Sequence, residues 1–156
     1  MQAGPMRVAF RLPWPPTVNT YWRSLRSGPL AGRVVLSKDA RAYRVRVGVE
    51  VHRQRVEQRL VTGRLSISVM ACPPDRRIRD LDNLWKSFLD ALVHAGVIRD
   101  DGDFDDMRIW RGPVVTDGLL HVEICELAGP TESFPLPLQV RDPIVDQALA
   151  IMRGGP

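Results

Sequence analysis

Aspartate residues are crowded into two short stretches near the middle of the chain, with arginine and lysine residues among them. The first stretch, residues 75–86, contains Asp80 and Asp82, and the second covers residues 100–106. Two side chains that are two residues apart in an extended segment point to the same side. Lys86 follows Asp82 by four residues, which is about one helical turn. The spacing therefore predicts several acids and one cation gathered at the start of a helix.

Carboxylates gathered so closely repel one another unless a cation joins them, and all-oxygen ligand sets favour Mg²⁺ or Mn²⁺. A bound metal ion can activate water for attack on a phosphodiester, and a neighbouring lysine can stabilise the charge that develops. Arg76, Arg77 and Arg79 come directly before the acids and are placed to hold a phosphate backbone. The residue types therefore indicate metal-dependent hydrolysis of nucleic acid.

The same residues also allow a purely structural interpretation. Asp80 or Asp82 can cap the helix, while Lys86 pairs with Asp82 or Asp90 on its surface, and the spacing alone favours neither interpretation. A calcium-binding loop fits less well, because Gly112 stands where such a loop requires a bidentate glutamate. The histidine, serine and cysteine residues show neither metal-ligand spacing nor a nucleophile elbow, so a covalent intermediate is not indicated.

Basic residues are concentrated in the first part of the chain. Residues 1–64 contain 13 basic and 3 acidic residues, and the chain as a whole has a net charge of +4. A basic segment beside an acidic one suits a protein that holds polyphosphate and also collects divalent cations. Many other proteins are asymmetric too, so this pattern supports the prediction without deciding it.

Residues 14–36 are predicted to form a loop, because prolines end the strand before it. This loop contains a mixture of cations, aromatic rings and glycines, which suits phosphates and unstacked bases. The alternative is that each ring packs onto the core instead. The candidate DNA contacts in the loop are Asn19, Tyr21, Trp22, Arg23 and Arg26.

Alternating apolar and polar residues predict four strands, at 6–12, 65–72, 107–115 and 119–127. A turn at residues 116–118, with the residue types of a hairpin, joins the last two strands. Apolar residues at helical spacing predict a helix over 81–95, ended by Gly96.

Residues 38–61 are ambiguous, because the valines at 45, 47, 49 and 51 alternate as in a strand, whereas Ser37 can cap a helix. No pair of turn residues interrupts this stretch before Gly63, so one long helix is favoured. Its inward side chains are predicted to be Tyr43, Val47, Val51 and Leu60.

The order of elements is therefore β-α-β-α-β-β, which predicts a small single α/β domain with a mixed sheet of about four strands and two main helices. Residues 1–128 form this domain, and 129–156 are a proline-containing C-terminal extension in which 145–152 can form a short helix. Neither cysteine has disulfide or zinc spacing, and no apolar run is long enough to span a membrane. We expect a cytoplasmic protein that is not attached to a membrane.

Several blocks of sequence carry a family resemblance. The blocks are Leu12-Pro13-Trp14-Pro15-Pro16, Pro74-Asp75-Arg76-Arg77, Arg79-Asp80-Leu81-Asp82-Asn83-Leu84, Asp90-Ala91-Leu92 with Ala95-Gly96, Asp100-Asp101, and Asp106. In this order and at this spacing, over about residues 6–127, the chain resembles the RusA family of Holliday junction resolvases. The long 14–36 segment and the 129–156 extension depart from the compact family pattern.

The resemblance implies a RusA-like domain that uses Mg²⁺, for which Mn²⁺ can substitute. It also implies a homodimer that makes paired symmetric nicks in four-way DNA junctions during recombination and repair, in a bacterial cell or a bacteriophage-infected host. By resemblance the metal-binding aspartates are Asp80, Asp82 and Asp101, the catalytic lysine is Lys86, and the secondary members are Asp90 and Asp100. Two symmetric cuts in a pseudo-twofold substrate also fit a twofold dimer on physical grounds.

Two other classes of protein remain compatible with the sequence. A nucleic-acid-binding module has the basic surface but does not cut. A structural or regulatory protein uses the acidic stretch to bind another protein, and it predicts no salt-dependent affinity for DNA.

Overall fold

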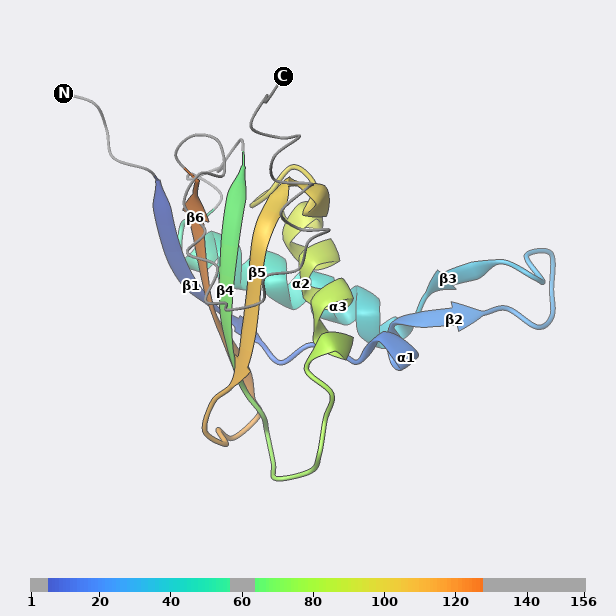
Figure 1. The fold of residues 1–156 in the computed structure, drawn as a ribbon. Helices are drawn as coiled ribbons and strands as arrows, with labels where there is room; N and C mark the ends of the chain where they lie inside the picture. Colours follow the sequence, from blue (N-terminus) through green and yellow to red (C-terminus); the bar gives the residue numbers. More distant parts are fainter. Residues whose placement is uncertain (1–5, 57–63, 128–156) are drawn as a thin grey trace, which may run out of the picture.

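The fold is a two-layer α/β domain, described by a computed structural model over residues 6–56 and 64–127. Figure 1 shows a four-stranded sheet with helices packed on one face. The predicted extension, 129–156, lies outside the described residues. Within the described ranges, no helix has both the length and the apolar character needed to cross a membrane.

The sheet is mixed, as predicted, with the strand order β1-β6-β4-β5. Its strands are β1 (Arg7–Pro13), β4 (Leu65–Cys72), β5 (Phe104–Arg111) and β6 (Leu119–Glu126). β6 runs antiparallel to both β1 and β4, whereas β4 and β5 are parallel. The helix α3 (Asp82–His94) therefore forms the crossover between the two parallel strands.

The predicted pairing of the last two strands is wrong. β5 and β6 lie on opposite sides of β4, so the turn at 116–118 joins strands that are not neighbours. The reason is burial: β6 alternates buried and half-buried residues and takes a central position, whereas most of β5 is exposed and takes an edge. β5 also ends at Arg111 rather than 115, because Pro113 has no N–H to give to a ladder.

The helix after Ser37 is confirmed, but it is shorter than predicted. α2 spans Lys38–Arg53, and the Ser37 hydroxyl accepts a hydrogen bond from the Ala40 amide at 3.0 Å. Arg55 then adopts a positive φ of 56°, and the Val56 amide donates to the Val51 carbonyl at 3.0 Å. This left-handed turn buries Val56 and ends the helix, while the predicted inward residue Leu60 lies outside the described residues.

The α3 helix is confirmed to within one residue at each end. Leu84, Phe88 and Leu92 are fully buried along its inner side, as their helical spacing predicted. Gly96 ends the helix with a φ of 73°, and the Val97 amide donates to the Leu92 carbonyl at 3.0 Å. These helix residues share the core with the inward residues of the strands: Val8, Phe10, Leu12, Leu65, Ile67, Val69, Ala71, Leu120, Val122 and Ile124.

Residues 14–36 are not a loop throughout, which corrects the prediction. They contain α1 (Val18–Tyr21) and a two-stranded hairpin of β2 (Trp22–Ser24) and β3 (Val34–Leu36). Three residues are too few to show alternation, so the pattern could not reveal these strands. The hairpin, which we call the arm (residues 22–36), projects away from the sheet and helices.

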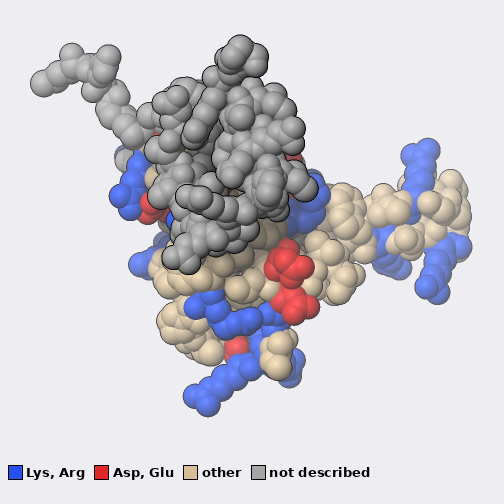
Figure 2. Space-filling view, viewed as in Figure 1, with Lys and Arg blue, Asp and Glu red and all other residues tan. Residues whose placement is uncertain are grey.

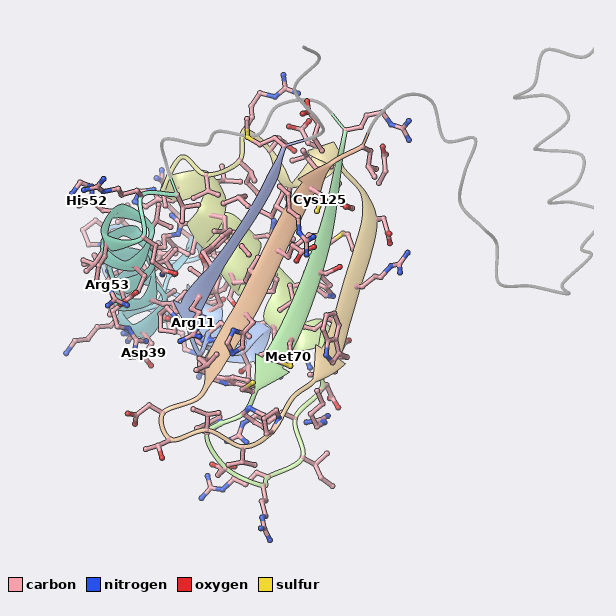
Figure 3. The ribbon with its side chains drawn as sticks, turned by 90° about the vertical axis from the view of Figure 1, so that its left-hand side faces the viewer. Arg11, Asp39, His52, Arg53, Met70 and Cys125 are labelled. Atoms are coloured by element: carbon pink, nitrogen blue, oxygen red, sulfur yellow. The ribbon has the colours of Figure 1, made fainter. Side chains whose placement is uncertain are left out.

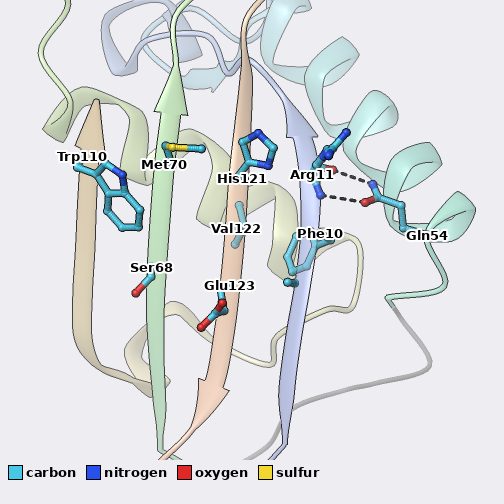
Figure 4. Close-up of a pocket in the computed structure, with 10 residues that line it drawn as sticks. Phe10, Arg11, Gln54, Ser68, Met70, Trp110, His121, Val122 and Glu123 are labelled. Carbon is cyan, nitrogen blue, oxygen red and sulfur yellow. Dashed lines mark hydrogen bonds between the residues drawn. The ribbon is translucent and has the colours of Figure 1, made fainter. Parts of the chain in front are cut away.

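The other face of the sheet is not covered by any described helix (Figure 3). It contains a hollow of about 590 Å³, lined among others by Met70, Trp110 and His121 (Figure 4). Gln54 lies beside this hollow, and its side chain makes two hydrogen bonds to the backbone of the edge strand β1, which we call the Gln54 clasp. Its side-chain oxygen accepts from the Arg11 amide at 2.9 Å, and its nitrogen donates to the Arg11 carbonyl at 2.8 Å.

The Gln54 clasp should contribute measurably to stability. Replacing Gln54→Ala removes both hydrogen bonds to the edge of β1, and we expect the free energy of unfolding to fall by about 1–2 kcal/mol in urea denaturation. Val45→Ala, on the exposed side of the same helix, is the control and should change it by less than about 0.5 kcal/mol. Equal effects of the two variants would contradict a stabilising role for the clasp.

Candidate active site

Three of the predicted site residues meet on the exposed side of α3. The Lys86 Nζ atom lies 3.1 Å from Asp90 Oδ1 and 3.4 Å from Asp101 Oδ2. Lys86 and Asp90 are one turn apart on α3, and Asp101 begins a short 3-10 helix, η2 (Asp101–Asp103), that contacts α3. In Figure 2 acidic side chains form a patch over α3, with basic side chains on the arm to one side and on the loop below.

Lys86 is held as a cation by its neighbours. The hydrogen bond to Asp90 raises the pKa of Lys86, and the charges of Asp90 and Asp101 act in the same direction. Partial burial opposes this shift but does not reverse it. Lys86 is therefore suited to stabilise negative charge and not to act as a base at neutral pH.

Asp80 and Asp82 lie at the start of α3, but neither caps it. Leu81 occupies the capping position, and no side chain there bonds to the helix amides. Asp80 Oδ2 accepts one long hydrogen bond, 3.4 Å, from Asn83 Nδ2. Asp82 makes no side-chain hydrogen bond or ion pair among the described residues. The capping interpretation thus fails, and both exposed carboxylates are open to a ligand.

The donor chemistry at this site suits a hard divalent ion, because carboxylate oxygens are the ligands that Mg²⁺ and Mn²⁺ prefer. Within the ranges 6–56 and 64–127, however, no three histidine, cysteine, aspartate or glutamate side chains lie close enough together to form a metal-binding group. Asp80, Asp82 and Asp101 therefore offer exposed oxygens without forming a closed ligand set in one chain.

Asp100 positions the segment that contains Asp101. Its Oδ1 atom accepts a hydrogen bond from the Gly102 amide at 2.7 Å and so caps η2. A Cβ atom at position 102 would lie 2.9 Å from that same oxygen, which explains the glycine. The structure thus gives Asp100 a positioning role for the segment that contains Asp101.

The basic loop before α3 (residues 73–81) is braced by one ion pair. The Asp75 carboxylate accepts two hydrogen bonds from the Arg79 guanidinium, at 2.6 and 2.8 Å, and one from the Arg77 amide at 2.9 Å. The Arg79 guanidinium lies over the Trp14 ring, 5.9 Å from its centroid, and Arg111 donates to the Arg79 carbonyl at 2.8 Å. These contacts hold the loop in one conformation.

This bracing corrects part of the predicted phosphate surface. Arg79 is only 18% exposed and uses its guanidinium within the loop, so it is a structural residue here. Arg76 and Arg77 are exposed and remain candidates. The four-residue spacing of Asp75 and Arg79 could have suggested their ion pair. Trp14 and Arg111 come from distant parts of the chain, and no local pattern identifies them.

The arm begins beside the active site. Tyr21 is fully buried at its base, and its hydroxyl accepts a hydrogen bond from Arg44 Nε at 3.1 Å. Burial raises the pKa of Tyr21, and the hydrogen bond from Arg44 lowers it. The charge of Asp90 also raises this pKa, whereas the charge of Lys86 lowers it. The prediction that Tyr21 contacts DNA therefore does not fit its position. The ring anchors the arm.

The other predicted contacts in this segment are exposed. Asn19 lies on α1, which contacts α3, and Arg23 and Arg26 lie on the arm. Trp22 is 43% exposed and makes an edge contact with the Tyr21 ring, at 5.4 Å between centroids. Apart from Tyr21, the structure thus leaves the predicted DNA contacts of residues 19–26 accessible.

Comparisons with known proteins identify the family of the chain. Residues 13–125 match the profile of the family Endodeoxyribonuclease RusA. The chain is 43% identical over 118 residues to the crossover junction endodeoxyribonuclease rusA of Enterobacteria phage HK97, covering 76% of this chain and 93% of that protein. It is 38% identical over 116 residues to the RusA proteins of Escherichia coli (strain K12) and Enterobacteria phage 82, covering 74% of this chain and 92% of each.

The names of these relatives describe endodeoxyribonucleases that act at crossover junctions. The chain belongs to the RusA family of endodeoxyribonucleases. The resemblance of the sequence blocks is thereby confirmed.

The brace in the basic loop should show a defined pH dependence. The hydrogen bonds from Arg79 and Arg77 hold the pKa of Asp75 well below its usual range. The charged Asp75 carboxylate therefore stabilises the folded protein fully at pH values above its pKa in the unfolded chain, which is about 4. This stabilisation is lost as the pH falls through the lower pKa that Asp75 has in the folded protein. Asp75→Asn should lower the urea midpoint at pH 7, and the gap to the unchanged protein should narrow below about pH 4.

Asp117→Asn provides the control, because Asp117 is an exposed turn residue without a side-chain partner in the described part of the chain. Its midpoint should follow that of the unchanged protein throughout. A gap for Asp75→Asn that stays constant down to pH 3 would show that the ion pair does not brace the loop.

Proposed function

We propose that this protein is a Mg²⁺-dependent endodeoxyribonuclease that resolves Holliday junctions by paired symmetric nicks in DNA recombination and repair. The observation that carries the proposal is that Asp80 and Asp82 are exposed at the start of α3 and do not cap it, on the same helix that positions Lys86 through its ion pairs. The relatives' names give the substrate, because they are crossover junction endodeoxyribonucleases.

In this proposal Asp80, Asp82 and Asp101 hold the metal ion, and Mn²⁺ can replace Mg²⁺. When bound, the ion supplies positive charge at the phosphate and lowers the pKa of a water molecule. Asp101 comes from a different element than the other two acids, so its position depends on η2 and on the Asp100 cap.

Lys86 contributes a fixed positive charge near the reacting phosphate. Asp90 holds the ammonium group from the next turn of α3, so Asp90 is a positioning residue. Charge that develops on the phosphate oxygens is stabilised best by groups that are already oriented. Removing either partner therefore affects the rate more than the affinity for DNA.

Exposed cations on either side of the acidic patch hold the DNA backbone. Arg76 and Arg77 lie on the loop that leads into α3, and Arg23 and Arg26 lie on the arm. Phosphate contacts of this kind set the position of the duplex and need not read its sequence. A DNA-binding module that does not cut would need these cations, but it would not need the exposed acids at the start of α3.

The active form is proposed to be a homodimer, since paired symmetric cuts need two sites related by the twofold axis of the substrate. The partner molecule is branched DNA, a four-way junction. The relatives come from a bacterium and from bacteriophages, so the proposed location is the cytoplasm of a bacterial cell or of an infected host.

Asp82→Asn tests the proposed chemistry directly. Cleavage of a labelled four-way junction with Mg²⁺ should fall by more than about 100-fold, because a ligand for the ion is lost. Binding to the junction should stay equal or tighten, since one negative charge near the phosphates is removed. Asp39→Asn, which removes an exposed acid at the start of α2, should cut normally. Normal cutting by Asp82→Asn would reject the proposed site.

The arm should contribute electrostatic affinity for DNA. In the double variant Arg23→Ala/Arg26→Ala, the slope of log affinity against log salt concentration should become shallower by about 1–2, as each lost phosphate contact removes close to one unit. Arg11→Ala is the control, because Arg11 lies on the uncovered face of the sheet (Figure 4). Equal slopes for the arm variant and the unchanged protein would place the DNA elsewhere.

A further inference from the structure

Ile78 is an isoleucine placed almost entirely in solvent. It is 95% exposed, more than any other large apolar residue that the structure describes. It lies between Arg77 and Arg79 in the basic loop, which extends beyond the body of the molecule at the bottom of Figure 1. An isolated apolar side chain at such a place gains free energy when a partner covers it.

The loop holds Ile78 outward and does not let it fold back. The Asp75 carboxylate binds Arg77 and Arg79, the residues on either side of Ile78. Arg111 also holds the carbonyl of Arg79. Because these hydrogen bonds already order the backbone of the loop, the loop loses little conformational entropy when Ile78 binds a partner.

Charge and distance identify the partner. Arg76 and Arg77 expose two cations next to Ile78, which favours a polyanion over a neutral protein surface. Two peptide links separate Ile78 from Asp80, so their Cα atoms lie at most about 7 Å apart. One step along a DNA strand is about 3.4 Å. DNA bound at the proposed active site therefore passes Ile78 within a few base pairs of the cut.

We propose that Ile78 is a wedge that packs against the open face of a base pair at a DNA branch point, and so selects branched over linear DNA. Apolar side chains that enter a continuous duplex must first unstack a step. At a branch point the stacking is already interrupted, so the same contact costs less there. Ile78 is then a specificity-determining residue. This inference rests on the proposed function and adds to it a means of substrate selection.

Ile78→Ala tests the wedge in binding assays that need no cleavage. With EDTA present, affinity for a fluorescent four-way junction should fall on the order of tenfold, the effect of losing most of a buried isoleucine. Affinity for the matching linear duplex should change less than about twofold. Ile78→Leu keeps the apolar bulk and should retain junction affinity. Val45→Ala, an exposed valine on α2, should change neither affinity.

A second readout reports the contact itself. A 2-aminopurine base at the branch point should brighten when the unchanged protein binds, because the base is unstacked, and Ile78→Ala should bind without that increase. Equal losses on both DNAs, or no loss, would overturn the wedge. A change in oligomeric state by sedimentation would also overturn it, since Ile78 would then contact a second copy. If the unchanged protein shows no junction preference, the proposed function itself fails.

Discussion

The ion pairs that join Lys86 to Asp90 and Asp101 are the contacts on which the proposed active site depends. The pair with Asp90 lies within α3, whereas the pair with Asp101 connects α3 to the segment that returns from it and leads into β5. Parallel pairing of β4 with β5 forces the chain to cross the sheet and come back along the helix. The topology thus brings Asp101, which follows Lys86 by 15 residues, back to the side of α3 that carries Lys86.

A second ion pair, between Asp75 and Arg79, holds the loop that leads into this helix. The Trp14 ring, just after β1, packs against the Arg79 guanidinium, and Arg111, at the end of β5, donates to the Arg79 carbonyl. The position of the loop therefore depends on the sheet. Arg79 is therefore unavailable for the phosphate contact that its sequence suggested, whereas its neighbours are presented to solvent. The fold separates the structural cation from those that can hold DNA.

Patterns within one element were sufficient to predict the main helices, the strands and the residues that line α3. Its acids and lysine lie within a few positions of one another, and helical spacing relates Lys86 directly to Asp90. Longer relations were not predictable: β6 lies between β1 and β4 because of burial, and Tyr21 is buried by packing against distant elements. The short strands of the arm were not predicted, because three residues are too few to show an alternation of apolar and polar side chains.

The most direct test is to incubate the protein with a labelled four-way junction and a matching linear duplex, with Mg²⁺ or with EDTA, and to map every nick. The proposal that the exposed aspartates Asp80 and Asp82 at the start of α3 serve a junction-resolving endonuclease predicts paired symmetric nicks in the junction alone, which disappear with EDTA. Tight binding of the junction without metal-dependent nicks would contradict it and would identify a DNA-binding protein that does not cut.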